Sequence, residues 1–314
     1  MVKRVLLASP RGYCAGVERA VETVEKALEL HGPPVYVRKQ IVHNAHVVRR
    51  LEERGAVFVD DERDAPEGAI LVLSAHGVAP AVYERAAARR LRTIDATCPL
   101  VTKVHAEARR YAAEGYQIVL IGHAGHEEVV GTMGEAPDAI TLVESVEEAE
   151  ALELPDGPVA YVTQTTLSVD ETAEIVDALR KRFPSVRAPK REDICYATSN
   201  RQWAVKELLD EVDLLLVVGS RNSSNSNRLV GVARAAGIPA HLVDDESDID
   251  EEWLEEAETV GLTSGASAPE ELVQRVCEWF RARGVDEIAP HASVYEDVVF
   301  RLPVELRRAE TPAA

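Results

Sequence analysis

The sequence predicts an α/β fold made of three similar units in a pseudo-threefold arrangement. Each unit begins with a cysteine that precedes a stretch with apolar residues at helical spacing, and these are Cys14, Cys98 and Cys195. A short apolar strand follows each stretch after a nearly equal number of residues, beginning at Val35, Ile118 and Leu214. One order of elements that recurs along a chain indicates a structural repeat.

Polar loops recur in the same register as the strands. The first loop of each unit contributes His43, His126 and Ser224, and the second contributes His76, Thr165 with Thr166, and Ser267. Strands that alternate with helices form parallel sheets, and such sheets place ligands at the carboxyl ends of their strands. We therefore expect the three cysteines and these loops to meet in one central cavity.

The repeat also predicts the division of the chain. The three α/β units are expected at 14–97, 98–194 and 195–282. The flanking segments 1–13 and 283–314 are expected to supply an N-terminal strand and a C-terminal tail that pack on the body. Within that tail, Val298 to Leu302 has the pattern of a short strand.

Composition limits the classes of function. The chain has 314 residues, of which 46% are hydrophobic, and a net charge of −19 that is spread along its length, which disfavours nucleic-acid binding. No apolar run approaches the roughly 20 residues that span a bilayer, and no secretory segment is visible, so a cytoplasmic protein is expected. Four scattered cysteines without a CxxC pair are poor disulfide candidates in that compartment.

Three cysteines at helix starts suit a metal centre, because the helix dipole lowers the pKa of a thiol there. Thiolates favour iron–sulfur clusters or zinc. Structural zinc usually takes four ligands from close-spaced pairs, whereas one 4Fe-4S cluster on three cysteines leaves one iron open as a Lewis acid. The repeat favours the cluster over the alternative of buried apolar cysteines. That alternative is the expectation for Cys277, which lies on an apolar helix stripe outside the repeat.

Polar loops also indicate the ligand. Asn222 to Asn227, NSSNSN, opens a helix with hydroxyl, amide and backbone N–H groups that favour an anion, although an ordinary serine N-cap is the alternative. No GxxxxGKS or GxGxxG motif follows a strand, so a small diphosphate fits better than a nucleotide. Glu128 is the candidate proton donor, with its neighbour Glu127 as a comparison, although either could be an ordinary helix-start carboxylate.

These residues together resemble the family of 4-hydroxy-3-methylbut-2-enyl diphosphate reductase over about Cys14 to Pro269. The resemblance is carried by RGYCAGV, IVHN, LSAHGV, DATCPLVTKVH, GHAGHEEV, TQTTLSVDET, DICYATSNRQ, NSSNSNRL and GASAP. It implies the last step of the methylerythritol phosphate pathway of isoprene biosynthesis, a reductive dehydroxylation that gives isopentenyl diphosphate and dimethylallyl diphosphate. It also implies one oxygen-sensitive 4Fe-4S cluster and a ferredoxin or flavodoxin type electron donor.

Residue by residue, the resemblance makes Cys14, Cys98 and Cys195 the cluster ligands and Glu128 and Thr165 the catalytic pair. The implied substrate-binding residues are His43, His76, His126, Thr165, Ser223, Ser224, Asn225 and Ser267. One position departs from the family pattern, because Glu127 stands where that pattern has proline, which puts the rigidity of the loop in question. Two rivals stay open: a non-redox iron–sulfur dehydratase acting on a small phosphorylated substrate, and a non-catalytic cluster or metal-sensing protein.

Overall fold

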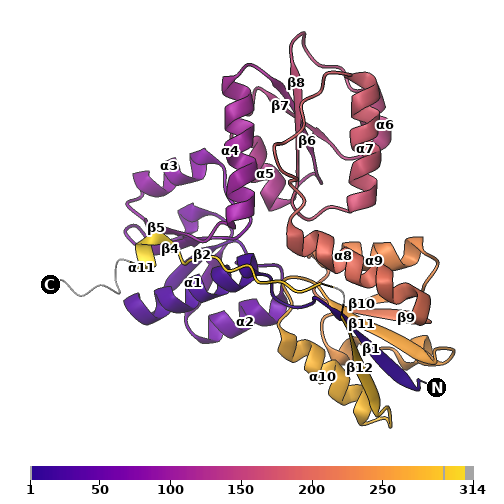
Figure 1. Cartoon of the computed structure of the whole chain (residues 1–314). Helices are drawn as coiled ribbons and strands as arrows, with labels where there is room; N and C mark the ends of the chain where they lie inside the picture. The colour runs from indigo at the N-terminus through magenta and orange to yellow at the C-terminus, as the bar shows by residue number, and fades with distance from the viewer. Residues whose placement is uncertain (1, 293, 308–314) are drawn as a thin grey trace. The chain divides into compact units, whose positions relative to one another are not determined.

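The computed structural model describes residues 2–292 and 294–307 (Figure 1). Its described residues form two compact units. Unit 1 comprises Met1–Val17, His43–Val47 and Tyr196–Val299, and unit 2 comprises Glu18–Val42, Val48–Cys195 and Phe300–Ala314. The described helices are all too short or too polar to cross a membrane.

Unit 1 is built on one parallel sheet of five strands. Its order is β10 (Ala240–Val243), β9 (Leu214–Val218), β11 (Thr259–Ser264), β1 (Arg4–Ser9) and β12 (Glu287–Ala292). The helices of this unit are α8 (Tyr196–Leu208), α9 (Ser224–Ala235) and α10 (Glu270–Arg281), with short 3-10 turns at Leu209–Glu211, Glu246–Asp248 and Glu251–Leu254.

Both faces of this sheet are buried, as the continuous apolar runs of its strands require. Alternate residues of β9 point to opposite faces, so Leu216 packs with the α10 side and Leu215 with the α8 and α9 side. Cys277 on α10 is fully buried in the first of these clusters. The prediction that Cys277 is a core residue is therefore confirmed.

Unit 2 contains two further parallel sheets. The first has the order β3 (Ala56–Val59), β2 (Val35–Arg38), β4 (Ile70–Leu73) and β5 (Arg92–Asp95). The second has the order β7 (Ile140–Val143), β6 (Gln117–Ile121) and β8 (Val159–Thr163). Every strand pairing in the described residues is parallel, so the predicted α/β class is confirmed.

Unit 2 also contains helices, most of which lie between these strands in the sequence. They are α1 (Ala15–His31, whose first residues lie in unit 1), α3 (Pro80–Ala88), α4 (Pro99–Ala113), α5 (Glu127–Met133), α6 (Val146–Ala151), α7 (Val169–Arg182) and α11 (Val304–Arg307). Helix α2 (Ala45–Glu53) begins in unit 1 and continues into unit 2, and a 3-10 turn covers Glu62–Asp64. The helices predicted after the three cysteines are confirmed.

Each of the three sheets has the same two backbone hydrogen bonds at the carboxyl ends of its strands. One backbone N–H just past a strand donates to the edge strand, in the pairs Lys39 to Val59, Gly122 to Val143 and Gly219 to Val243. Another donates back to the first strand or its exit, in the pairs Ala75 to Ile41, Gln164 to Ile121 and Gly265 to Val218. These equivalent bonds are what a threefold repeat of one βα plan requires.

Two expectations about the ends of the chain have different outcomes. The N-terminal strand is confirmed as β1. The strand expected at Val298 to Leu302 is wrong, because this stretch has no strand pairing and the last strand is β12. Of the expected tail 283–314, residues 293 and 308–314 lie outside the described residues, and the boundaries 14–97, 98–194 and 195–282 stay a prediction.

Candidate active site

The three cysteines of the repeat occupy equivalent places. Cys14 immediately precedes α1, Cys98 is the N-cap of α4, and Cys195 immediately precedes α8. All three are half-buried thiols rather than disulfides. Partial exposure leaves these thiols accessible to a ligand, and cysteine sulfur is the donor that iron–sulfur clusters take, so the donor set fits such a cluster.

Each of these cysteines is tied by its backbone to a second polar loop. The N–H of Cys98 donates to the carbonyl of Ala75 at 3.0 Å, that of Cys195 to Thr165 at 3.0 Å, and that of Cys14 to Ala266 at 3.4 Å. The residues that follow these acceptors are His76, Thr166 and Ser267. The structural register therefore pairs Thr166 with His76 and Ser267, whereas Thr165 corresponds to the two alanines.

No three His, Cys, Asp or Glu side chains within 2–292 and 294–307 are grouped to hold a single metal ion. In a four-iron cluster, separate irons take the cysteines, so a shared ion is not the arrangement expected here. Cys14 lies in unit 1, and Cys98 and Cys195 lie in unit 2. The meeting of the three cysteines in one cavity stays a prediction.

Glu128 and Thr165 form a buried pair in unit 2. The backbone N–H of Thr165 donates to Oε1 of Glu128 at 2.6 Å, and the Thr165 hydroxyl donates to Oε2 at 2.9 Å. The Glu128 residue is only 2% exposed. Burial raises the pKa of its carboxyl group, against the opposite effect of the two bonds from Thr165. A carboxyl group in this position holds its proton more readily than an exposed one.

His126 begins the helix that carries Glu128. As the N-cap of α5, its Nδ1 accepts from the Glu128 N–H at 3.2 Å, so the neutral ring carries its proton on Nε2. Burial, with a smaller effect from His76, lowers the pKa of His126 to about 4. The His76 and His126 rings meet edge-on, with centroids 5.9 Å apart, and neutral His126 can present an N–H donor.

Glu127 is the first residue of α5, a position that a proline also tolerates. Its Oε2 lies 3.3 Å from Nδ1 of His76. The residue that departs from the family pattern therefore starts the same helix turn, and it adds a carboxylate next to one of the expected substrate-binding histidines. The helix N-terminus itself is retained.

The serine-rich loop of unit 1 caps α9. Oγ of Ser223 accepts from the N–H of Ser226 at 3.3 Å, so Ser223 is the N-cap of α9, and anion binding by the same loop stays a prediction. Oδ1 of Asn225 accepts from the N–H of Ala266 at 2.9 Å, which ties the loop to the residue before Ser267. Nδ2 of Asn222 lies 3.4 Å from Nδ1 of His43, at the edge of hydrogen-bonding distance.

These contacts join His43, Asn225 and the Ser267 loop within unit 1, while Glu128, Thr165, His76 and His126 gather within unit 2. Ser224 is the first residue of α9 and is half-buried. That the two groups of residues line one pocket stays a prediction.

Two buried polar residues within the recognised motifs were not predicted as site residues. Arg201 on α8 is fully buried, where its guanidinium donates to the carbonyl of Gly12 at 2.7 Å and pairs with Glu296 at 3.1 Å. His105 on α4 pairs with Glu135 at 2.7 Å. The motifs DICYATSNRQ and DATCPLVTKVH contain Arg201 and His105, but their partners lie too far along the sequence to be recognised from spacing.

Comparison with known proteins identifies the family. The family model described as LytB protein matches residues 5–281. The chain belongs to the LytB family. It is 64% identical to a 4-hydroxy-3-methylbut-2-enyl diphosphate reductase of Acidothermus cellulolyticus, covering 98% of this chain and 91% of the relative. It is 62% identical to the reductase of the same name from Mycolicibacterium paratuberculosis, covering 98% and 93%.

Solved structures agree with the LytB assignment. The E-1-hydroxy-2-methyl-but-2-enyl-4-diphosphate reductase of Plasmodium falciparum matches with a TM-score of 0.95 at 41% identity, over 98% of each chain. A second structure, titled (E)-4-hydroxy-3-methyl-but-2-enyl diphosphate reductase, the terminal enzyme of the non-mevalonate pathway, matches with a TM-score of 0.63 at 32% identity, over 90% of this chain and 100% of that one. The resemblance found in the LytB motifs is thereby confirmed.

Proposed function

We propose that this LytB chain carries out the reaction for which its relatives are named. It is an iron–sulfur oxidoreductase that reduces 4-hydroxy-3-methylbut-2-enyl diphosphate to isopentenyl diphosphate and dimethylallyl diphosphate, the last step of the methylerythritol phosphate pathway. The observation that carries this proposal is 64% identity over 98% of the chain to a reductase of that name. The buried Glu128–Thr165 pair supports it on chemical grounds.

The cluster type and its ligands are part of the proposal, which assigns one 4Fe-4S cluster with one open iron to Cys14, Cys98 and Cys195. When bound, such a cluster supplies single electrons and a Lewis-acidic iron. A common site is supported by hydrogen bonds between residues that lie close in sequence to different cysteines. The Tyr196 hydroxyl accepts from the Ala15 N–H at 3.2 Å, and the Arg19 guanidinium donates to the Thr97 carbonyl at 3.0 Å.

The diphosphate is assigned to His43, His76, His126, Ser223, Ser224, Asn225 and Ser267, with Thr165 beside them. Neutral donors predominate in this set, because His126 stays neutral at physiological pH and the serine and asparagine groups are uncharged. Backbone N–H groups at the start of α9 add further donors to an anion. Binding would thus rely on many hydrogen bonds rather than on an arginine clamp.

The proton that leaves with the substrate hydroxyl is assigned to Glu128. Burial raises the pKa of this carboxyl, which favours the protonated acid, and Thr165 fixes both of its oxygens. Thr165 can turn its hydroxyl from donor to acceptor when Glu128 is protonated. The pair can therefore hold a proton at a defined atom until the C–O bond breaks.

Electrons come in this proposal from a ferredoxin or flavodoxin type protein in the cytoplasm. The decisive experiment is anaerobic reconstitution of the full chain, with iron and sulfide counted before turnover is measured. We expect about four irons per chain and products only when a reductant is added. A dehydrated product formed without reductant would instead establish the dehydratase.

A further inference from the structure

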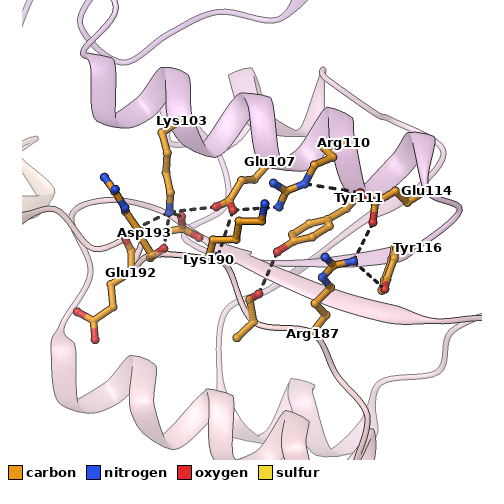
Figure 2. A network of polar contacts seen from close by, with 12 residues as sticks. Lys103, Glu107, Arg110, Tyr111, Glu114, Tyr116, Arg187, Lys190, Glu192 and Asp193 are labelled. Atoms are coloured by element: carbon orange, nitrogen blue, oxygen red, sulfur yellow. Dashed lines mark hydrogen bonds and ion pairs between the residues drawn. The ribbon is translucent and has the colours of Figure 1, made fainter.

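The segment 187–193, which leads to Cys195, is bound along its whole length. At its start, the Arg187 N–H donates to the Val159 carbonyl at 2.8 Å, and the Tyr161 N–H donates to the Arg187 carbonyl at 3.0 Å. The segment therefore begins as an extension of the sheet beside β8. From there it passes over α4 through the network of side chains in Figure 2.

One face of α4 binds this segment. Lys103, Glu107 and Tyr111 are spaced four residues apart, so they lie in one row on the helix, which we call the α4 row. The Tyr111 hydroxyl donates to the Ala188 carbonyl at 2.9 Å, and Glu107 Oε1 accepts from the Lys190 N–H at 3.1 Å. At the other end of the α4 row, Nζ of Lys103 donates to the carbonyls of Arg191 and Glu192 and to the carboxylate of Asp193.

The order of these contacts sets a direction. Tyr111, near the end of α4, holds the start of the segment, and Lys103 holds its end. The segment thus runs antiparallel to α4, toward the helix N-terminus that Cys98 caps. Helix α4 thus has one expected cluster ligand, Cys98, at its N-terminus, and it binds the segment that leads to a second expected ligand, Cys195.

Asp193 is the junction between this row and the expected catalytic residues. Its side chain is fully buried, with Oδ1 2.5 Å from Nζ of Lys103 and Oδ2 accepting from the Thr163 N–H at 2.9 Å. Thr163 ends β8, and two residues later the Thr165 carbonyl accepts from the N–H of Cys195. The two bonds fix the register of the segment against the loop that carries Thr165.

We propose that Lys103 and Asp193 are positioning residues, which hold Cys195 in register with Thr165 and Glu128 before any cluster is bound. The inference rests on the proposed function, since it takes Cys195 as a ligand and Glu128 as the acid. A ligand loop built in advance loses little conformational freedom when the cluster enters, which favours binding. Lys103 is needed because a buried carboxylate without a partner cation is strongly destabilising.

The first measurement is amide hydrogen exchange of the full chain without a cluster. Lys103→Met removes the ammonium and retains the length of the side chain. We expect the peptides that contain Cys195 and Thr165 to exchange on the order of tenfold faster or more, while exchange in unit 1 stays unchanged. The second measurement is iron content after anaerobic reconstitution, which should fall in parallel.

Two comparison variants sharpen the test. Lys3→Met breaks an exposed pair with Glu258 in unit 1, and it should change neither measurement. Tyr111→Phe removes only the bond to Ala188, at the far end of the segment, so it should loosen the start of the segment more than the peptide of Cys195. Lys103→Arg restores a cation and should recover part of the protection.

Distinct results would overturn the proposal. Unchanged exchange at Cys195 and Thr165 in Lys103→Met would show that Lys103 does not position the loop. Uniformly faster exchange throughout unit 2 would make it a general stability residue. If Lys103→Met does not fold, Asp193→Asn, which retains an oxygen for the Thr163 N–H, takes its place with the same expectation. A wild-type chain that binds no iron would contradict the proposed function but leave the exchange result standing.

Discussion

Glu128 receives two hydrogen bonds from Thr165, one from the backbone N–H at 2.6 Å and one from the side-chain hydroxyl at 2.9 Å. Each carboxylate oxygen thus has one donor, and the whole group is buried. Burial raises the pKa of Glu128, while these bonds act to lower it. The pair therefore combines a raised pKa with a fixed orientation, which is the combination that general acid catalysis needs.

Glu128→Gln tests the acid directly. The glutamine fits the same space, because its oxygen can accept from the Thr165 N–H while the Thr165 hydroxyl turns to accept from its amide. We expect cluster content and substrate binding to persist and turnover to fall by about 100-fold or more. The measurement is steady-state reduction with a chemical donor under anaerobic conditions, after iron has been counted.

Glu127→Pro is the matched control for Glu128→Gln. Proline is tolerated at the first position of a helix, and the change removes only the contact with His76 at 3.3 Å. Turnover should therefore stay within a few-fold of the wild type. Loss of activity in Glu127→Gln with activity retained in Glu128→Gln would assign the acid to the other residue.

His126 makes stability depend on pH. Its folded pKa of about 4 lies below the ordinary value near 6.5, so the unfolded chain binds the proton more readily. The contribution is full above about pH 6.5 and is lost as pH falls toward 4. The measurement is urea unfolding of the apo chain at about pH 7.5 and at about pH 5. The free energy of unfolding should fall between these two pH values in the wild type, and it should fall by up to about 2 kcal/mol less in His126→Asn, which retains an N-cap acceptor. Equal losses in both proteins would contradict the buried neutral histidine.

Local patterns were sufficient for some features of the fold and not for others. The helices after Cys14, Cys98 and Cys195 follow from apolar spacing, which depends only on neighbouring residues. The contact of Lys103 with Asp193 joins residues ninety positions apart, and such a pair depends on the tertiary fold. The apolar pattern of Val298 to Leu302 suggested a strand, yet a strand also needs a partner, and β12 already pairs with the free edge of β1.

The candidate site shows the same limit. Spacing along the repeat identified the second polar loops, but it assigned Thr165 and Thr166 together to one position. The bond from the Cys195 N–H to the Thr165 carbonyl resolves them, because its counterpart in the first sheet is the bond from Cys98 to Ala75. Thr165 was nevertheless worth selecting, since the same turn directs its side chain to Glu128.

Cysteine substitution tests the proposed cluster ligands. Serine is a hard and weakly acidic ligand, so Cys14→Ser, Cys98→Ser and Cys195→Ser should each lose most of the iron after anaerobic reconstitution. Cys277→Ser should retain the iron and lose roughly 1–3 kcal/mol of stability, because it buries a hydroxyl in an apolar cluster. Iron lost equally in all four variants would contradict the threefold assignment.

Pyrophosphate binding tests the expected diphosphate-binding residues of unit 1 without a cluster. Asn225 is 4% exposed and links the start of α9 to the loop of Ser267 through the Ala266 N–H. Asn225→Asp retains the oxygen that accepts this bond and adds a buried negative charge, so titration calorimetry of the apo chain should show at least about tenfold weaker binding. Ala235→Asp adds the same charge at an exposed position near the end of the same helix, where solvent screens it, and should weaken binding by less than about threefold. Equal effects of the two substitutions would mean that the anion senses only the overall charge of the helix, and Asn225 would then have no place in the diphosphate pocket.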